Sequence, residues 1–458
     1  MASNLAVRKS REAIVPPSRT GLDATTVASA IAVGALIVLA IWARNTPPTL
    51  HTLGDYLTNA GRITGLLAGY GVVVLLALMA RIPALEHGLG ADTLSRWHSI
   101  GGRYVVTMST VHTVTIIWGY SALSHSSLVG QTSTLVLHYP DVLMATAALG
   151  LLLLVGVMSA RAVRTKVRYE TWYLIHFYTY LAIALAFSHQ FSTGAEFMRT
   201  AWARWFWSAL YIGVGGLLLW YRFYIPLQIH RRHNLRVSKV VREAPGVVSI
   251  LISGDDIHDL GAAPGQFFRW RFLTPTGWWQ SHPFSLSAAP HPGSKQFRIT
   301  VKDLGDHSRE LQRVRPGTRV WAEGPYGSFT AARRTRRKVL LLAGGVGITP
   351  LRTLFETLPG KPGDILLAYR VEEEKDVLFR KELEQIATQR GHQVMILLGP
   401  PGGPKDPLHP QRLGKLIPNL SQFDVYVCGP PGMSRAAEAS LERLGVPRSH
   451  IHTEKFEF

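Results

Sequence analysis

The sequence predicts a multidomain membrane protein in which a bundle of six transmembrane helices is followed by an antiparallel β-barrel and then by an α/β domain. The bundle is predicted by six apolar stretches of roughly 20 residues, the length that crosses a bilayer core. The soluble domains are predicted by short alternating apolar stretches after residue 224 and by longer apolar strand patterns after residue 333. The apolar stretches lie at 25–42, 63–79, 100–123, 142–163, 172–188 and 205–221, and the predicted domains are an N-terminal segment 1–24, the bundle 25–223, the barrel 224–332 and the α/β domain 333–458.

The formal net charge of +19 is distributed as in a membrane protein rather than as in a nucleic-acid-binding protein. Basic residues gather before the first apolar stretch, between the fourth and the fifth, and after the sixth, whereas residues 121–139 contain no Lys or Arg. The positive-inside rule then predicts a multi-pass plasma-membrane protein with both termini in the cytoplasm and no nucleic-acid partner. The N-terminal residues do not have the pattern of a signal peptide. Cys428 is the single cysteine, which excludes disulfides, four-thiolate iron–sulfur clusters and covalently attached haem within the chain.

Four histidines lie in the third and fifth apolar stretches or directly beside their ends, as two pairs, where an ionisable side chain needs a partner. His98 and His112 are 14 residues apart, and His176 and His189 are 13 apart, which gives separations of roughly 20 Å along two like-directed helices. The pattern predicts two stacked b-type haems, with the iron of one held by His98 and His176 and that of the other by His112 and His189. The alternative is that each histidine is a hydrogen-bonded packing residue. Because 13 residues leave His189 roughly 140° from the face of His176, we predict a helix irregularity within residues 177–188.

Two arginines and two further histidines are secondary candidates in the membrane half. Arg62, at the outer mouth of the second stretch, and Arg103, in the third, could each contact a haem propionate or a reduced oxygen species. The alternative for both is that the side chain extends to the membrane interface. His125 and His138 lie in the outer loop, where we expect them to be solvated, with binding of an incoming metal complex as the alternative.

The barrel region contains the motif HPFSLS at 282–287, which suits the edge of a flavin. The motif combines a histidine, a rigid proline and an aromatic ring with hydroxyls at alternate positions. The turn GDHS at 305–308 opens a short helix whose N-terminal amides could bind the flavin pyrophosphate. The predicted FAD residues in this region are Gln266, Phe267, His282, Pro283, Phe284, Ser285, Ser287, Lys302, His307 and Ser308.

Two glycine-rich strand ends in the α/β domain predict a site for a nicotinamide dinucleotide. GGVGITP at 344–350 lets the backbone approach a pyrophosphate, and CGPPGM at 428–433 ends another strand at the same carboxyl edge of the sheet. Arg370 ends the second strand pattern, where the adenosine ribose lies, and its pairing with a 2′-phosphate favours NADPH over NADH. The predicted nucleotide residues are Gly344, Gly345, Gly347, Ile348, Thr349, Pro350, Arg370, Cys428, Gly429, Pro430, Pro431, Gly432 and Met433.

With the paired histidines, HPFSLS, GGVGITP, CGPPGM and the closing KFEF in this order, residues 25–458 resemble the NADPH oxidase and ferric reductase superfamily, specifically a compact prokaryotic NADPH oxidase-like form. The resemblance implies that the four histidines ligate two b-type haems. It also implies a ferredoxin–NADP reductase-like module with FAD at 282–285 and NADPH at 344–350 and 428–433. The terminal Phe458 would stack on the flavin and yield to nicotinamide, so Phe458, Cys428 and Arg62 are the expected catalytic residues. Several members have a further histidine one turn beyond the outer haem ligand, where this chain has Ile116.

The expected function is electron transfer from cytoplasmic NADPH through FAD and the haems to oxygen on the outer side, which produces superoxide. The flavin is needed because nicotinamide delivers two electrons together whereas haem accepts one. The alternatives are a ferric-chelate or quinone reductase with the same electron path, and a cytochrome b subunit that donates electrons to a protein partner. The sequence identifies no such partner and contains no EF-hand calcium loop.

Overall fold

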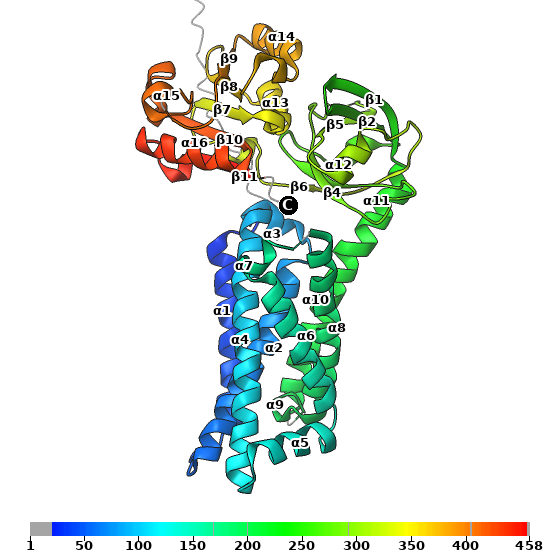
Figure 1. Cartoon of the computed structure of the whole chain (residues 1–458), viewed down its shortest axis with the longest axis vertical. Coiled ribbons are helices and arrows are strands. Elements are labelled where there is room, and N and C mark those ends of the chain that lie inside the picture. Colours follow the sequence, from blue (N-terminus) through cyan, green and yellow to red (C-terminus); the bar gives the residue numbers. More distant parts are fainter. Residues whose placement is uncertain (1–20, 168, 199, 292, 404, 456–458) are drawn as a thin grey trace, which may run out of the picture. The chain divides into compact units, whose positions relative to one another are not determined.

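The structure, a computed structural model, describes residues 21–455 except Arg168, Arg199, Pro292 and Pro404. The chain forms two compact units, one of residues 21–224 and a second that begins at Ile225 (Figure 1). The described part of the first unit is helical and ends in a π-helical turn, Trp220–Tyr224. Its α-helices are α1 (Ala24–Asn45), α2 (Leu53–Leu78), α3 (Pro83–Leu89), α4 (Ala91–Ser124), α5 (Leu128–His138), α6 (Val142–Ser159), α7 (Arg161–Arg164), α8 (Tyr169–Thr193), α9 (Ala195–Met198) and α10 (Ala201–Leu219).

Close helix packing in the first unit depends on small residues. Helix α2 packs along α4, and α6 packs along α8. A β-carbon added at Gly65 would lie 2.6 Å from Nδ1 of His112, and one added at Gly61 would lie 2.6 Å from the side chain of Ile116. These glycines of α2 therefore leave the space that the side chains of α4 occupy.

Among the described helices, four are long and apolar enough to cross a membrane, namely α1, α2, α6 and the helix that begins at Ala201. The predicted count of six is not confirmed, because α4 and α8, which carry the paired histidines, are not among the four. Polar residues lower the hydropathy of α4, but many of its hydroxyls are satisfied within the helix. Thr110, Thr113 and Thr115 each donate to the carbonyl four residues earlier.

The predicted irregularity within residues 177–188 is wrong. Helix α8 is one uninterrupted α-helix over Tyr169–Thr193, and the π-helical turn of this unit lies at Trp220–Tyr224 instead. Both histidines of α8 nevertheless reach their partners on α4. The two histidine side chains therefore reach α4 from different directions on α8, and no break in the helix is needed.

The second unit begins with α11 (Ile225–His233) and an antiparallel barrel of two three-stranded sheets, ordered β1-β2-β5 and β4-β3-β6. Isolated bridges Arg236↔Arg319 and Leu286↔Ile299 join the two sheets. Alternate residues of β3 are buried, as a strand with one face on a core requires. The elements are β1 (Arg236–Ala244), β2 (Val247–Ser253), β3 (Phe267–Phe272), β4 (His282–Ser285), β5 (Gln296–Lys302), α12 (Asp306–Leu311) and β6 (Val320–Tyr326).

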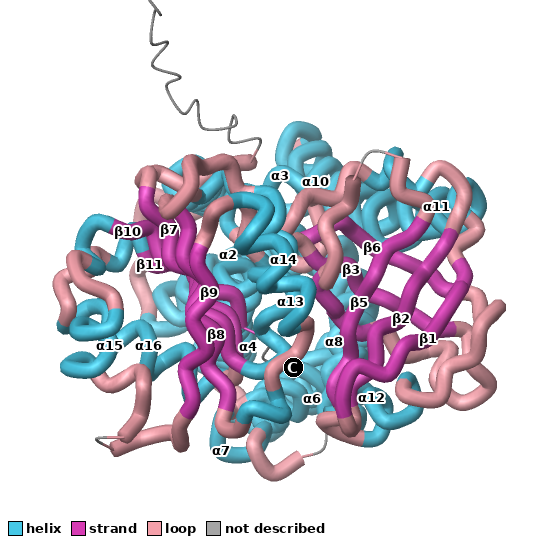
Figure 2. The backbone as a smooth tube through the Cα atoms, turned by 90° about the horizontal axis from the view of Figure 1, so that it is seen from above, coloured by secondary structure: helices cyan, strands magenta, loops and turns pink. Residues whose placement is uncertain are grey.

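The α/β domain has a five-stranded parallel sheet in the order β11-β10-β7-β8-β9 (Figure 2). Its strands are apolar along their length because helices cover both faces. The fifth strand, β11, was not predicted from the sequence. The elements are β7 (Lys338–Gly344), α13 (Ile348–Thr357), β8 (Ile365–Val371), α14 (Arg380–Arg390), β9 (Gln393–Leu398), α15 (Pro410–Leu416), β10 (Phe423–Gly429), α16 (Pro431–Arg443) and β11 (Ile451–Lys455).

Candidate functional site

The structure brings the four paired histidines together in the predicted combinations. The ring centres of His98 and His176 are 6.0 Å apart, and those of His112 and His189 are 6.4 Å apart. An ion bound between two imidazoles requires a ring separation of about 6 Å, since a metal–imidazole bond is about 2.0 Å long and the nitrogen lies about 1.1 Å from the ring centre. Within the described residues, no three or more His, Cys, Asp or Glu side chains gather as a metal site. Each pair therefore fits an ion whose other ligands come from a cofactor, as in haem.

In the pair of His112 and His189, both Nδ1 atoms are within hydrogen-bond distance of an acceptor. Nδ1 of His112 lies 2.8 Å from the carbonyl oxygen of Gly61, and Nδ1 of His189 lies 2.8 Å from the hydroxyl of Thr193. The Thr193 hydroxyl donates to the carbonyl of His189, so it accepts from the ring. A ring that donates from Nδ1 is fixed in the tautomer that leaves Nε2 free to bind a metal.

The pair of His98 and His176 is held differently. Nδ1 of His98 lies 3.3 Å from the carbonyl oxygen of Leu75. Nδ1 of His176 is buried with no hydrogen-bond partner among the described residues, and the ring of Trp172 stacks on the His176 ring with centres 5.0 Å apart. Ring stacking thus orients His176, whereas hydrogen bonds orient the other three.

Arg62, a predicted catalytic residue, is held by protein groups. Its guanidinium forms an ion pair with Glu196, whose side chain is 5% exposed. The same group donates to the Asn59 side chain at 3.1 Å and to the carbonyl of Asn45 at 3.2 Å. Arg62 is therefore engaged with other residues of the helical unit. Arg103, His125 and His138 are exposed.

The strand register of the barrel brings several predicted FAD residues together. Phe267 of β3 pairs with Ser285 of β4 on one side and with Tyr326 of β6 on the other. Gln266 donates to the carbonyl of Gly327, which follows Tyr326. The hydroxyl of Ser285 is buried without a hydrogen-bond partner in the described structure, which leaves it available to a ligand. Tyr326 and Gly327 belong to the segment GPYGSF at 324–329 and were not among the predicted FAD residues.

Other predicted FAD residues lie apart from this group. Ser287 is fully buried, and its hydroxyl accepts a hydrogen bond from Thr300 inside the barrel. The hydroxyl of Ser308 caps its own turn by accepting from the amide of Leu304. Lys302 is exposed at the end of β5, and Pro283 and Phe284 lie on β4. The structure does not gather Ser287 or Ser308 with Ser285.

His282 and His307, both predicted FAD residues, stack face to face with ring centres 3.7 Å apart. Burial, together with the neighbouring His307 and Arg269, lowers the pKa of His282 to about 4. Burial also lowers the pKa of His307. Both rings are therefore neutral at neutral pH, so they can stack closely without repulsion.

We predict that the second unit loses stability as the pH falls, with His282 as one cause. Between its ordinary pKa of 6.5 and its folded-state pKa of about 4, the unfolded chain binds a proton that the folded chain does not. The stability is fully present above the ordinary pKa and decreases by on the order of 1 kcal/mol as the pH falls toward the folded value. Thermal unfolding at neutral and acidic pH should show a smaller acid-induced decrease in His282→Asn than in the wild type. Equal decreases would contradict the prediction.

The two glycine-rich turns of the α/β domain pack directly against each other. A β-carbon at Gly344 would lie 1.9 Å from Sδ of Met433, and one at Gly347 would lie 2.2 Å from the carbonyl oxygen of Cys428. The turns share the carboxyl edge of the sheet, since Cys428 of β10 pairs with Ala343 of β7. The two turns therefore lie side by side at this edge, where Gly345 is partly exposed and Gly432 is exposed.

The remaining predicted nucleotide residues are largely engaged with the protein. Burial raises the pKa of the Cys428 thiol, so this side chain stays protonated. The hydroxyl of Thr349 donates to the carbonyl of Val346, and Ile348 and Pro350 are buried in α13. The other predicted residues lie in the glycine-rich turn after β7, at the end of β10 or in the first turn of α16, and Pro430 directly precedes α16. Phe458, the third predicted catalytic residue, lies outside the described residues.

An ion-pair network that was not predicted from the sequence joins the barrel to the α/β domain. Arg298 of β5 forms two hydrogen bonds of 2.8 Å with the carboxylate of Glu382 in α14. Arg352 of α13 contacts the same carboxylate at 2.7 Å and contacts Glu356 at 2.8 Å. These side chains fix the barrel against the nucleotide domain. No local sequence pattern reveals them, because the partners come from three separate elements.

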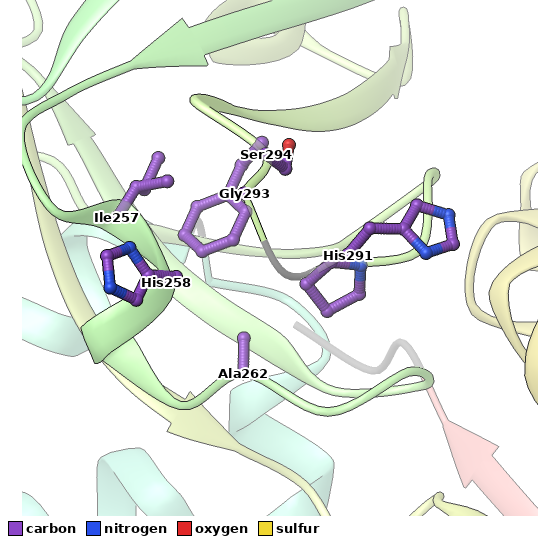
Figure 3. A pocket seen from close by; sticks show the side chains of 8 residues that line it. Ile257, His258, Ala262, His291, Gly293 and Ser294 are labelled. Atoms are coloured by element: carbon purple, nitrogen blue, oxygen red, sulfur yellow. The ribbon is translucent and has the colours of Figure 1, made fainter.

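Figure 3 shows a pocket on the barrel, between His258 and His291. Nε2 of His291 lies 3.1 Å from the carboxylate of Glu356, so this ring is engaged with α13. None of the predicted FAD residues lines the pocket, so we do not assign it to the cofactor. The lining residues are Ile257, His258, Ala262, Pro290, His291, Gly293, Ser294 and Phe297.

Three family matches divide the chain in the same order as the structure. Residues 64–187 match a family described as the ferric reductase like transmembrane component. Residues 236–330 match an FAD-binding domain, and residues 341–439 match an oxidoreductase NAD-binding domain.

The chain is similar in sequence to a monooxygenase reductase subunit and to a flavohemoprotein. The chain is 30% identical over 241 residues to the glycine betaine monooxygenase reductase subunit of Chromohalobacter salexigens, covering 49% of this chain and 64% of that protein. It is 29% identical over 237 residues to the flavohemoprotein of Deinococcus radiodurans, covering 48% and 58%. The chain thus spans less than two thirds of the length of these relatives. The flavohem-like FAD/NAD-binding domain of nitric oxide dioxygenase from Vibrio cholerae is similar in structure, with 26% identity and a TM-score of 0.42 over 49% of this chain and 99% of that one.

The helical unit and the matched domains define a transmembrane oxidoreductase with an FAD-binding domain and an NAD-binding domain. The three domains in this order give the chain the architecture of the NADPH oxidase and ferric reductase superfamily.

Proposed function

We propose that this protein carries electrons across a membrane, from a reduced nicotinamide dinucleotide through FAD and two b-type haems to oxygen, and that superoxide is the product. The observation that carries the proposal is the pair of histidine couples, whose ring separations of 6.0 and 6.4 Å each fit one iron ion. In this proposal α4 and α8 complete a six-helix bundle in the plasma membrane. Both termini are cytoplasmic, as the distribution of basic residues favours.

Residues of this chain supply the binding and orientation in this path. Gly61, Leu75 and Thr193 accept hydrogen bonds from three imidazoles, which presents each Nε2 to its iron. The 14 residues between His98 and His112 separate the two iron sites by roughly 20 Å along the helix. Two histidines would hold each haem iron from the protein side, which would suit the haems to electron transfer rather than to oxygen binding at the metal.

In the second unit, the strand ends at Ser285 and Tyr326 would hold the flavin, and the turn at 344–347 would present backbone to the nucleotide pyrophosphate. Bound FAD would accept a hydride and pass its two electrons on singly, as haem requires. The ion pair from Arg298 to Glu382 holds the two binding domains together. We retain the terminal Phe458 as the residue that covers the flavin until nicotinamide arrives.

A ferric-chelate reductase with the same path is the second candidate, and two observations favour it. Ile116 stands where several superfamily members have a histidine near the oxygen site. The guanidinium of Arg62 is neutralised by Glu196, so it presents little net charge to a small anion. A quinone or a protein partner could also take the electrons by the same route.

The test uses the purified full-length protein in detergent, loaded with haem and FAD, with oxygen as the sole acceptor. The proposal predicts consumption of the nicotinamide nucleotide and reduction of cytochrome c that superoxide dismutase abolishes. Reduction that stalls until an iron chelate or a quinone is added would make oxygen the wrong acceptor. Absence of haem in the reconstituted protein would overturn the electron path itself.

A further inference from the structure

The carboxyl end of β8 carries an arginine and a glutamate that would meet the adenosine half of a bound dinucleotide. Arg370 pairs in register with Gly344, the first residue of the glycine-rich turn, and Glu372 follows β8 directly. In open parallel sheets of this kind, the adenosine ribose lies over the strand end next to the phosphate-binding turn. There an acidic side chain binds the ribose 2′-hydroxyl of NADH, whereas an arginine accommodates the 2′-phosphate of NADPH.

Arg370 is poorly placed to receive a phosphate group. Its side chain is only 10% exposed, and its Nη2 donates to the carbonyl oxygen of Gly399 at 3.1 Å. Its Nε is buried without an acceptor among the described residues. The guanidinium is thus directed along the strand ends rather than out to solvent, and a phosphate that approached it would also meet Glu372.

Glu372 is the carboxylate that remains available at this strand end. Glu373 forms an ion pair with Lys375 at 2.7 Å, and Glu374 forms one with Arg380 at 2.8 Å. Among the described residues, the carboxylate of Glu372 has only a distant contact, 3.9 Å from Nη1 of Arg370, and its side chain is 64% exposed. An exposed carboxylate without a close cation can accept a hydrogen bond from a ligand hydroxyl.

We propose that Glu372 sets the nucleotide specificity and that the electron donor is NADH. The inference rests on the proposed function, in which a nicotinamide nucleotide reduces the flavin. Glu372 accepts a hydrogen bond from the ribose 2′-hydroxyl of NADH. The 2′-phosphate of NADPH would place a charge of about −1.5 to −2 against the same carboxylate. This reverses the preference for NADPH that Arg370 favours in the sequence.

The experiment measures flavin reduction in the full-length, FAD-loaded protein under anaerobic conditions by stopped-flow absorbance, with NADH and with NADPH. Only hydride transfer is observed, so neither the haems nor the terminal acceptor affects the result. The second-order rate constant should be at least about tenfold higher with NADH, because the 2′-hydroxyl of NADH offers Glu372 a hydrogen bond whereas NADPH places a phosphate beside it. In Glu372→Gln this ratio should decrease by about tenfold, mainly through faster reaction with NADPH.

Glu373→Gln is the matched control, since it removes a neighbouring carboxylate that is paired with Lys375, and it should keep the wild-type ratio. A wild type that reacts faster with NADPH, or an Arg370→Gln variant that loses its reaction with NADPH alone, would overturn the inference and leave the proposed function standing. A flavin that neither nucleotide reduces would overturn both. The absorbance of bound FAD in each variant verifies that the site is intact.

Discussion

Replacing His112 by alanine is expected to remove one of the two haems and to lower electron delivery to the outer acceptor by at least about 100-fold. Loss of a hydrogen-bond partner behind a metal ligand alone costs about 10–100-fold, and here the ligand itself is removed. His112 is the partner of His189 across α4 and α8, so the iron of that pair would retain one protein ligand. The measurement is haem per protein by the pyridine haemochrome assay, together with the rate of acceptor reduction.

Two controls make this result specific. His125→Ala removes a histidine from the C-cap of the same helix, where the side chain is exposed, and it should retain both haems. Flavin reduction by the nicotinamide nucleotide should be unchanged in His112→Ala, since that step needs only the second unit. Two haems per protein in His112→Ala would show that His112 is a packing residue.

The sequence predicts the histidine pairs because helix geometry is local. Fourteen residues return to within roughly 40° of the same helix face, so His98 and His112 are expected on one side of α4. The same reasoning fails for α8, where 13 residues predict a break that the structure does not contain. The direction of a side chain depends on the helix packed beside it, and the sequence of α8 does not contain that information.

In the second unit, too, some features of the predicted binding sites follow from the local sequence and others depend on packing. GGVGITP and CGPPGM could be placed at one sheet edge, because strands of a parallel sheet end together and the glycines there have a backbone role. The sequence could not show that Ser285 and Ser287 have different environments, because residues two apart share a face of an ideal strand. In the structure the hydroxyl of Ser287 is hydrogen-bonded to Thr300, whereas that of Ser285 has no partner among the described residues. The environment of Arg370 likewise depends on Gly399, which comes from a different strand end.

Replacing Gly347 by alanine is expected to lower the rate of flavin reduction by nicotinamide nucleotide by about 100-fold, since a displacement of about 1 Å in a binding element can cost that much. The added β-carbon would lie 2.2 Å from the carbonyl oxygen and 2.5 Å from the carbonyl carbon of Cys428. Both are backbone atoms of β10, which is hydrogen-bonded to β7 and β11, so they cannot yield without moving the sheet edge. Gly347 has φ −62°, so alanine suffers no backbone strain and the effect is steric alone.

Because the expected effect is steric, a glycine substitution that causes no backbone clash serves as the control. Gly360→Ala changes the same domain in the loop before β8, where the nearest atom to the new β-carbon is the flexible end of Ile365 at 3.3 Å, and it should react at nearly the wild-type rate. Overpacking at Gly347 should also lower stability by about 1–3 kcal/mol, which thermal unfolding measures separately. Chemical reduction of the flavin by dithionite should proceed normally in Gly347→Ala, because only the nucleotide turn is displaced. Wild-type hydride transfer in Gly347→Ala would show that the two turns do not bind the dinucleotide in the arrangement that this structure presents.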